Sequence, residues 1–236
     1  MKENLVEKAY EEIKNMIYKF QLPPGAKVSD FALSNQIGIS RTPIRQAIMM
    51  LVSDGLVEAS GSRFIVPAIS IDRINAVYDA RLAIEIGLLR LAIRNGIAEE
   101  DLKTLREKID IVSKDYEASN VLEGIGHEIE MRYFLASLGN NTILYEAFKR
   151  VEKQSRVFSL FAVAFPIFLA PASYLNICNA IEAGNEIEAA MILEEFIEIS
   201  RKQKINAIEN FGENAFVKAY SHMSAVSGKA AENTLE

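Results

Sequence analysis

Hydrophobic positions in the first 66 residues predict three helices followed by a β-hairpin. Apolar side chains recur at helical spacing over 5–20, 31–37 and 44–51. Each of these stretches is followed by proline or glycine, which end helices: Leu22-Pro23-Pro24-Gly25, Gly38 and Gly55 in turn. Val57 and Phe64–Val66 then flank the polar segment 58–63, which predicts a two-stranded hairpin with Arg63 at its tip. This order of elements is that of a winged helix-turn-helix.

From residue 70 onward the pattern is helical throughout. Ser70 can cap a helix that runs to about Asn95 and has a wide apolar face. Further amphipathic stretches follow at about 98–118, 121–138, 141–163, 166–183 and 186–209. Helices of this number around one core predict a helical bundle. We therefore expect a mainly α protein with a winged helix-turn-helix at 1–68, an all-α helical-bundle effector domain at 69–210 and a flexible tail at 211–236.

The start of the third predicted helix carries the residues that suit DNA. Ser40 is a good N-cap whose hydroxyl can satisfy an amide of the first turn. Arg41 and Arg45 lie one turn apart outside the apolar stripe, with Thr42 beside them. Guanidinium and hydroxyl groups suit phosphate oxygens and guanine edges in a major groove. A solvated helix start would explain an isolated arginine pair, but the flanking elements favour a DNA-binding helix.

Composition and charge narrow the class further. The net charge is −6, yet residues 1–70 hold eight Lys or Arg and seven Asp or Glu, so the remaining 18 basic and 25 acidic residues make the second part acidic. This distribution favours a local basic surface over general phosphate binding. Cys178 is the only cysteine, no apolar run reaches the ~18 residues of a membrane span, and the N-terminus is charged. We expect a cytoplasmic protein that does not enter membranes.

The motifs of the first domain resemble those of GntR-type bacterial transcription regulators. The resemblance rests on Pro24-Gly25, on Ile37-Gly38-Ile39-Ser40-Arg41-Thr42-Pro43-Ile44-Arg45 and on Gly55-Leu56-Val57. It implies that Arg41, Thr42 and Arg45 contact the operator and that the wing reaches the adjacent minor groove. Ser40 and Arg63 are the further candidate DNA-binding residues.

The second domain resembles the FCD effector domain of the FadR-like subfamily of these regulators. Three segments carry the likeness: Val77–Glu85 with its Arg-x-x-x-Glu pattern, the Gly139-Asn140 helix junction, and Ala180–Asn185. Most FCD domains hold a divalent metal with one Asp and three His. The matching positions here are Glu128, Arg132, Tyr174 and Phe196, and the histidines are His127 and His222. A His–Glu pair at 127 and 128 supplies too few ligands, so we expect neither a metal nor another cofactor.

What replaces the metal is open at the level of sequence. Arg132 and Tyr174 are expected to project into one cavity, with Phe196 as an apolar wall. A buried guanidinium needs a partner, which is either Glu128 one turn away or the carboxylate of an effector. Arg81 and Glu85 fit a helix-surface ion pair as well as a ligand contact. The candidate effector-binding residues are Arg132, Tyr174, Phe196, Glu128, Arg81 and Asn141.

The leading hypothesis is a homodimeric, sequence-specific transcription regulator that binds a palindromic operator in double-stranded DNA and senses a small, anionic effector such as a carboxylate. The alternative is an all-α metal-binding protein or enzyme with an incidental basic helix. No Ser/His/Asp, Cys/His or Gly-rich phosphate motif supports an enzyme. A DNA-architectural protein without a sensor is a third class, but it would not need the large helical domain.

Overall fold

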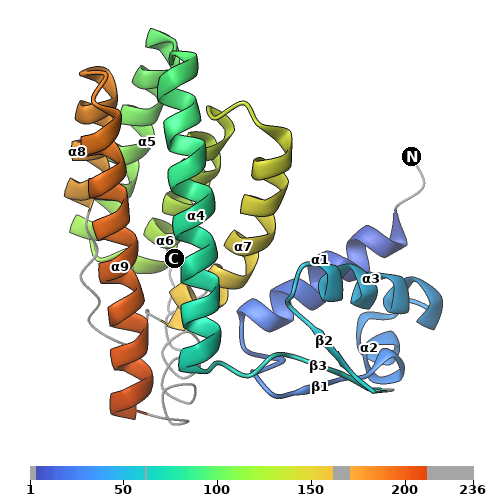
Figure 1. Cartoon of the computed structure of the whole chain (residues 1–236). Coiled ribbons are helices and arrows are strands. Elements are labelled where there is room, and N and C mark those ends of the chain that lie inside the picture. Colours follow the sequence, from blue (N-terminus) through green and yellow to red (C-terminus); the bar gives the residue numbers. More distant parts are fainter. Residues whose placement is uncertain (1–3, 62, 162–170, 212–236) are drawn as a thin grey trace, which may run out of the picture.

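The chain forms a small N-terminal unit and a helical bundle that lie side by side (Figure 1). The computed structural model describes residues 4–61, 63–161 and 171–211. The predicted tail therefore lies outside the described residues, except for Phe211 at the end of the last helix, and so do His222 and the start predicted for the helix at 166–183. The elements of the N-terminal unit are α1 (Leu5–Tyr18), β1 (Lys27–Val28), α2 (Asp30–Ile37), α3 (Arg41–Ser53), β2 (Glu58–Ser60) and β3 (Arg63–Ile65).

The three predicted helices of the N-terminal unit are confirmed, but the predicted hairpin is only part of the sheet. The sheet has three antiparallel strands in the order β1-β3-β2. Val28 of β1 pairs with Phe64, and Arg63 pairs with Ser60 of β2. The prediction missed β1 because two residues are too short to show a period. The prediction that Arg63 lies at the hairpin tip is wrong, because Arg63 is the first paired residue of β3.

The turn between α2 and α3 is fixed by local interactions. Ser29 caps α2 by accepting a hydrogen bond from the amide of Ala32. Gly38 ends α2 with φ 74°, a left-handed conformation that glycine adopts without a steric penalty. The hydroxyl of Ser34 donates to the carbonyl of Ile39 at 2.7 Å, which holds the turn closed. Helix α3, called the recognition helix below, therefore leaves α2 in one defined direction.

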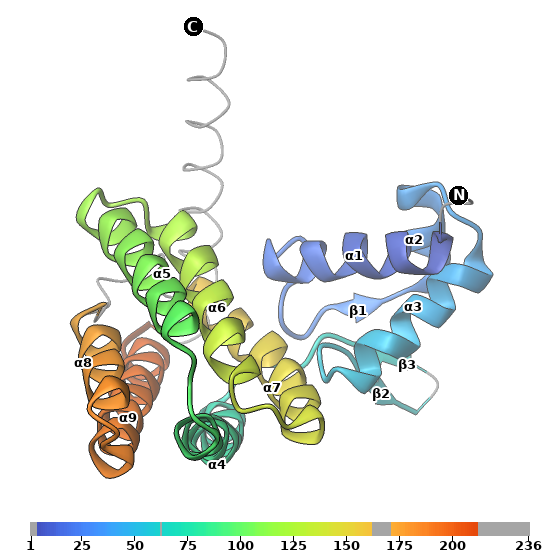
Figure 2. The ribbon, with the colours of Figure 1, turned by 90° about the horizontal axis from the view of Figure 1, so that it is seen from above.

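The helical bundle follows the predicted helices closely. Its elements are α4 (Ile71–Asn95), α5 (Glu99–Glu117), α6 (Val121–Ser137), α7 (Thr142–Phe161), α8 (Pro171–Glu182) and α9 (Glu186–Phe211). Helix α4 packs against α6, α7 and α9, so it lies between α7 and α9 in both views (Figures 1 and 2). The buried side chains of Tyr78, Leu89, Met131 and Ile197 belong to one core cluster. Within the described residues, no helix is both long and apolar enough to cross a membrane.

Gly139 marks the closest approach between α4 and the chain that follows α6. A Cβ atom built at Gly139 would lie 2.8 Å from the backbone oxygen of Leu88 in α4. Since real Cβ atoms do not approach backbone that closely, this packing requires glycine. The Gly139-Asn140 junction noted in the sequence thus has a packing reason.

The two units share apolar contacts. Val157 of α7 and Ala207 of α9 belong to the same buried cluster as Ile17 of α1 and Leu51 of α3. A void of about 20 Å³ lies at this boundary, between Gly55 of the winged helix and Gln154 of α7. The bundle therefore contacts the N-terminal unit directly, through α7 above all.

Candidate DNA interface and effector site

The recognition helix presents its predicted polar residues to solvent. Its buried side is formed by Ile44, Ala47, Ile48 and Leu51, as the apolar stripe predicts. The side chains of Arg41 and Arg45 are 61% and 67% exposed, and Thr42 is exposed between them. The helix therefore offers two guanidinium groups and a hydroxyl on one accessible side, which fits phosphate and base-edge contacts.

A carboxylate of the preceding helix, Asp30, lies against these arginines. One Nη atom of Arg41 donates to both oxygens of Asp30 at 3.1 Å. An Nη atom of Arg45 lies 3.9 Å from Oδ2 of Asp30. Asp30 is the first residue of α2 and lies eleven positions before Arg41, so only the fold brings the three together. The carboxylate positions both guanidinium groups in the absence of DNA.

Two further DNA-binding candidates behave differently from each other. Ser40 occupies the N-cap position of the recognition helix but makes no side-chain capping hydrogen bond. The predicted cap interaction is therefore wrong, and Ser40 is exposed to solvent. Arg63 is exposed at the start of β3, next to the turn of the wing. It remains available to a nucleic acid, although it is not at the tip.

Inside the bundle, Arg132 pairs with Glu85 of α4 and not with Glu128. The guanidinium of Arg132 donates to the two oxygens of Glu85 at 2.9 and 3.3 Å, and Arg81 donates to Glu85 at 2.7 Å. All three side chains are buried. Burial by itself would raise the pKa of Glu85, but the charges of Arg132 and Arg81 lower it to about 2. Of the two partners left open by the sequence, Glu128 is therefore wrong, because Arg132 pairs with Glu85. Arg81–Glu85 is a core ion pair, not a surface one.

Glu128 serves a different group of side chains. Its two oxygens accept hydrogen bonds from the hydroxyls of Tyr174 at 2.7 Å and Tyr116 at 2.6 Å. His127 lies 2.6 Å from Asp115 through its Nδ1 atom. Within the described residues, no three His, Cys, Asp or Glu side chains lie close enough to share a metal ion. Arg132, Tyr174 and Phe196 occupy the positions where most FCD domains have metal-binding histidines. Their guanidinium, phenol and phenyl groups are not suitable metal ligands.

The predicted effector cavity exists but is nearly closed. Arg132 and Tyr174 both line it, as the sequence predicted, together with Glu85, Leu89 and Phe148. Its volume is about 10 Å³, room for about one water molecule. Phe196 does not line this cavity, although its ring lies 4.7 Å from that of Tyr174. A small acid can therefore enter only if the surrounding helices move.

Asn141 has a structural role at the start of α7. Its side-chain oxygen accepts a hydrogen bond from the amide of Leu144 at 3.0 Å, the pattern of a helix N-cap. It does not line the cavity at Arg132. The capping role accounts for this residue without a ligand.

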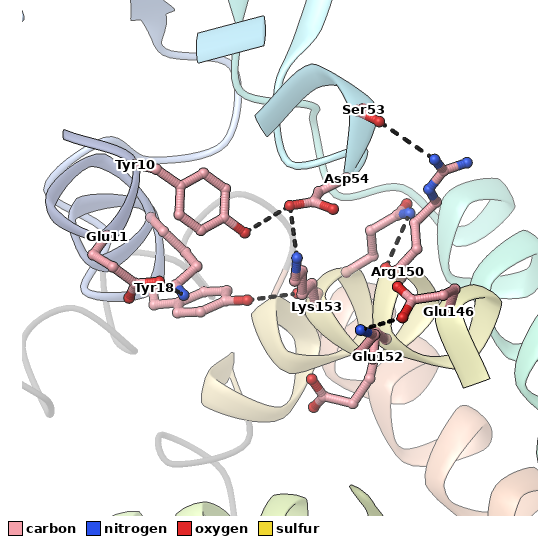
Figure 3. A network of polar contacts seen from close by, with 12 residues as sticks. Tyr10, Glu11, Tyr18, Ser53, Asp54, Glu146, Arg150, Glu152 and Lys153 are labelled. Atoms are coloured by element: carbon pink, nitrogen blue, oxygen red, sulfur yellow. Dashed lines mark hydrogen bonds and ion pairs between the residues drawn. The ribbon is translucent and has the colours of Figure 1, made fainter. Parts of the chain in front are cut away.

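Helix α7 connects the interior of the bundle to the winged helix, a role that the sequence did not suggest. Figure 3 shows Lys153 and Arg150 pointing toward the winged helix, whereas Glu152 points away from it. Lys153 donates to Asp54 at 2.8 Å, Arg150 donates to Ser53 at 3.3 Å, and the hydroxyl of Tyr18 donates to the carbonyl of Lys153 at 3.2 Å. On α4, Arg73 donates to Glu58 of the wing and to Gln154 of α7.

Comparison with known protein families covers both units. Residues 5–65 match the family described as "Bacterial regulatory proteins, gntR family". Residues 76–198, just over half of the chain, match the FCD domain. The two matches fall on the winged helix and on the helical bundle.

Individual relatives are transcriptional regulators. The HTH-type transcriptional regulator YdhC of Bacillus subtilis is 28% identical over 106 residues, which are 44% of this chain and 47% of that protein. The HTH-type transcriptional regulator McbR of Escherichia coli is 26% identical over 141 residues, 59% of this chain and 63% of McbR. The chain thus spans about half the length of the first relative and less than two thirds of the second. The solved structure of E. coli McbR/YncC shares the fold, with a TM-score of 0.73 and 20% identity over 86% of this chain and 97% of that one.

Proposed function

Because the chain belongs to the GntR family of bacterial regulatory proteins and carries an FCD domain, we propose that it is a transcription regulator that binds a specific DNA operator and responds to a small anionic effector. The relatives are transcriptional regulators and not enzymes, and no catalytic role is proposed. We propose a domain boundary at residues 68 and 69, which is consistent with the regions that match the two family models.

The exposed polar side of the recognition helix carries the DNA-binding part of this proposal. Arg41 and Arg45 are both highly exposed; Asp30 accepts hydrogen bonds from the guanidinium of Arg41 and lies within ion-pair distance of that of Arg45. Such pre-positioned arginines lose little side-chain entropy when they bind a phosphate or a guanine edge. Thr42 and Arg63 extend the same interface, which makes these four residues and Ser40 the proposed DNA contacts.

The effector part rests on the polar interior of the bundle. Arg132 and Tyr174 line one cavity, and ligand pockets in bundles lie between facing helices. Glu85 already neutralises part of the charge of Arg132 and Arg81. Its carboxylate therefore competes with the carboxylate of an effector for these two guanidinium groups. An effector must therefore reorganise these contacts, and α7 would carry the change to the winged helix.

The proposed assembly is a homodimer that reads a palindrome in the cytoplasm, where the chromosome lies. One winged helix offers a small interface, and two copies related by a two-fold axis double it. Sedimentation velocity of the purified chain, alone and on DNA, measures this assembly. A monomer under both conditions would refute the dimer.

The DNA-binding proposal is tested by sequencing genomic fragments that the purified chain enriches. We expect recovered fragments to share a palindromic sequence, with half-sites separated by about one helical turn of DNA. The control is the Arg41→Ala, Arg45→Ala double variant, which should recover no common sequence while keeping its helical circular dichroism. Equal enrichment by the wild type and the folded double variant would remove the assignment of α3 as the recognition helix.

A further inference from the structure

The exposed side of the recognition helix extends beyond its two arginines. Four exposed residues follow one another at the spacing i, i+3, i+4 and i+7, which places them opposite the buried stripe of the helix: Thr42, Arg45, Gln46 and Met49. Helices that lie in a major groove reach base edges with residues at this same spacing. Gln46 and Met49 therefore share a side with the proposed operator contacts Thr42 and Arg45, although neither of them is among the predicted DNA-binding residues.

Gln46 has a side chain whose hydrogen-bonding capacity is unused. Its carboxamide forms no hydrogen bond with any residue in 4–61, 63–161 or 171–211, whereas Arg41 donates to Asp30 and Arg45 lies 3.9 Å from the same carboxylate. A carboxamide carries a donor and an acceptor side by side. In the major groove adenine presents the matching pair, which is the acceptor N7 and the N6 amino donor. The side chain of Gln46 is therefore suited to an adenine.

Met49 is an apolar side chain that solvent reaches. It is 53% exposed and follows Gln46 by three residues on the same side of the helix. A thioether carries no charge and does not attract phosphate, so the DNA group that suits it is apolar. Thymine is the base that presents a methyl group in the major groove, and apolar side chains recognise it by contact. Since Met49 continues the surface of Thr42 and Arg45, operator DNA is the partner that this surface fits.

From this arrangement we propose that Gln46 and Met49 read A·T base pairs in each half-site of the operator, next to the contact of Arg45. Gln46 donates to N7 and accepts from N6 of one adenine, and Met49 packs against the C5 methyl group of a thymine. Residues three apart are separated by about 4.5 Å along a helix axis, close to the ~3.4 Å rise of one base pair, so the two contacts fall on neighbouring base pairs. The inference rests on the proposed function and adds part of the sequence that the operator must contain.

The inference is tested with operator duplexes that lack one base atom or group at a time. The operator is the sequence that the enriched genomic fragments share. Replacing an adenine by 7-deazaadenine removes N7 and keeps the base pair, and replacing a thymine by uracil removes the methyl group. For the wild type we expect one adenine per half-site where the first change weakens binding about fivefold or more, and a thymine of a neighbouring pair where the second change weakens it about threefold to fivefold.

Two variants should abolish these differences one by one. Gln46→Ala should bind the 7-deazaadenine and ordinary duplexes alike but remain sensitive to uracil, and Met49→Ala should show the reverse. Neither should change the dependence of the affinity on salt concentration, because neither side chain is charged. The matched controls are Gln21→Ala, at an exposed position after α1, and Met50→Ala, at the next position of α3, which is 38% exposed and falls outside the series of four. Both controls should discriminate between the duplexes as the wild type does.

The inference requires both the sensitivity of the wild type and its loss in the matching variant. If the wild type is insensitive to either modified base, or if its sensitivity persists in the folded variant, the inference is overturned, while the enriched fragments continue to support DNA binding. If no common sequence is enriched, the proposed function fails and the inference fails with it. Helical circular dichroism checks the fold of each variant, and the measurements on the wild type with modified bases do not depend on it.

Discussion

The ammonium group of Lys153 on α7 donates a 2.8 Å hydrogen bond to Asp54, the residue that ends the recognition helix. The same carboxylate oxygen accepts a hydrogen bond from Tyr10 of α1 at 2.6 Å. Burial, followed by this hydrogen bond to Asp54, raises the pKa of Tyr10, so the phenol stays protonated as a donor. A helix of the bundle and two helices of the winged helix therefore meet at one carboxylate (Figure 3).

Breaking this contact should separate the effector response from DNA binding. Both partners are mostly buried, so a double-mutant cycle of Lys153→Met and Asp54→Asn should give a coupling of about 1 kcal/mol in the free energy of unfolding. We expect Lys153→Met to bind operator DNA but to respond less to an effector. Lys149→Met is the control, because Lys149 pairs with Glu146 on the same helix. A full effector response in Lys153→Met would exclude this route.

The two arginines of the recognition helix should have different roles in operator binding. If Arg45 contacts a base edge, Arg45→Ala should weaken specific binding by about 1–3 kcal/mol and relax the preference at one base per half-site. Arg41→Ala should weaken binding to all DNA sequences alike and reduce the dependence of the affinity on salt concentration, as expected for a phosphate contact. Binding titrations at several salt concentrations measure both effects. Arg90→Ala, which removes a charge from α4, should change neither.

Removing the carboxylate that holds these arginines should loosen specificity. Asp30 competes with DNA for Arg41 and repels nearby phosphates. Asp30→Asn should therefore bind non-specific DNA more tightly and lower the ratio of specific to non-specific affinity. The same titrations with operator and scrambled DNA measure the ratio, with Asp110→Asn in α5 as the control. An unchanged ratio would mean that Asp30 does not compete with DNA for these guanidinium groups.

The buried carboxyl of Glu152 should make stability depend on pH. Burial raises its pKa in the folded state above the unfolded value, so the folded state binds the proton more tightly. The stability that the protonated form contributes is complete below about pH 4.5 and is lost as the pH rises through the folded pKa. Glu152→Gln cannot ionise and should keep that stability. Its Tm should match the wild type near pH 4 and exceed it at pH 7, and a constant difference across this range would contradict the assignment.

The close packing at Gly139 should tolerate no side chain. The added methyl group of Gly139→Ala would lie 2.8 Å from the backbone oxygen of Leu88, so the chain must shift, at a cost of about 1–3 kcal/mol. Gly126→Ala is the matched control, since a Cβ there has nothing within 4 Å; it should stabilise α6 slightly by helix propensity. Urea denaturation of both variants measures the difference. Equal stability would show that α4 is not held against this junction.

The sequence by itself determined the helices, their order and the hairpin of β2 and β3, but not strand β1. Period 3.6 in the apolar positions located the helices, and Gly38 and Ser70 marked helix ends by backbone conformation and local hydrogen bonding. It also located Arg41 and Arg45 outside the apolar stripe, because the face of a helix follows from spacing alone. Capping hydrogen bonds were predicted less reliably than helix ends, because Ser40 occupies the N-cap position of α3 without the expected hydrogen bond.

The tertiary structure decided which charges meet. Spacing along one helix suggested Glu128 for Arg132, but α4 brings Glu85 to Arg132 across 47 residues of sequence. Likewise Asp30 reaches Arg41, and Asp54 reaches Lys153, only after distant helices have packed. Helical periodicity fixes the side of a helix on which a residue lies, whereas the packing of helices fixes what faces that side. Oε1 of Glu152 and Oγ of Ser155 are left without a partner in the same way, because whether a buried polar atom finds a partner depends on the neighbouring helices.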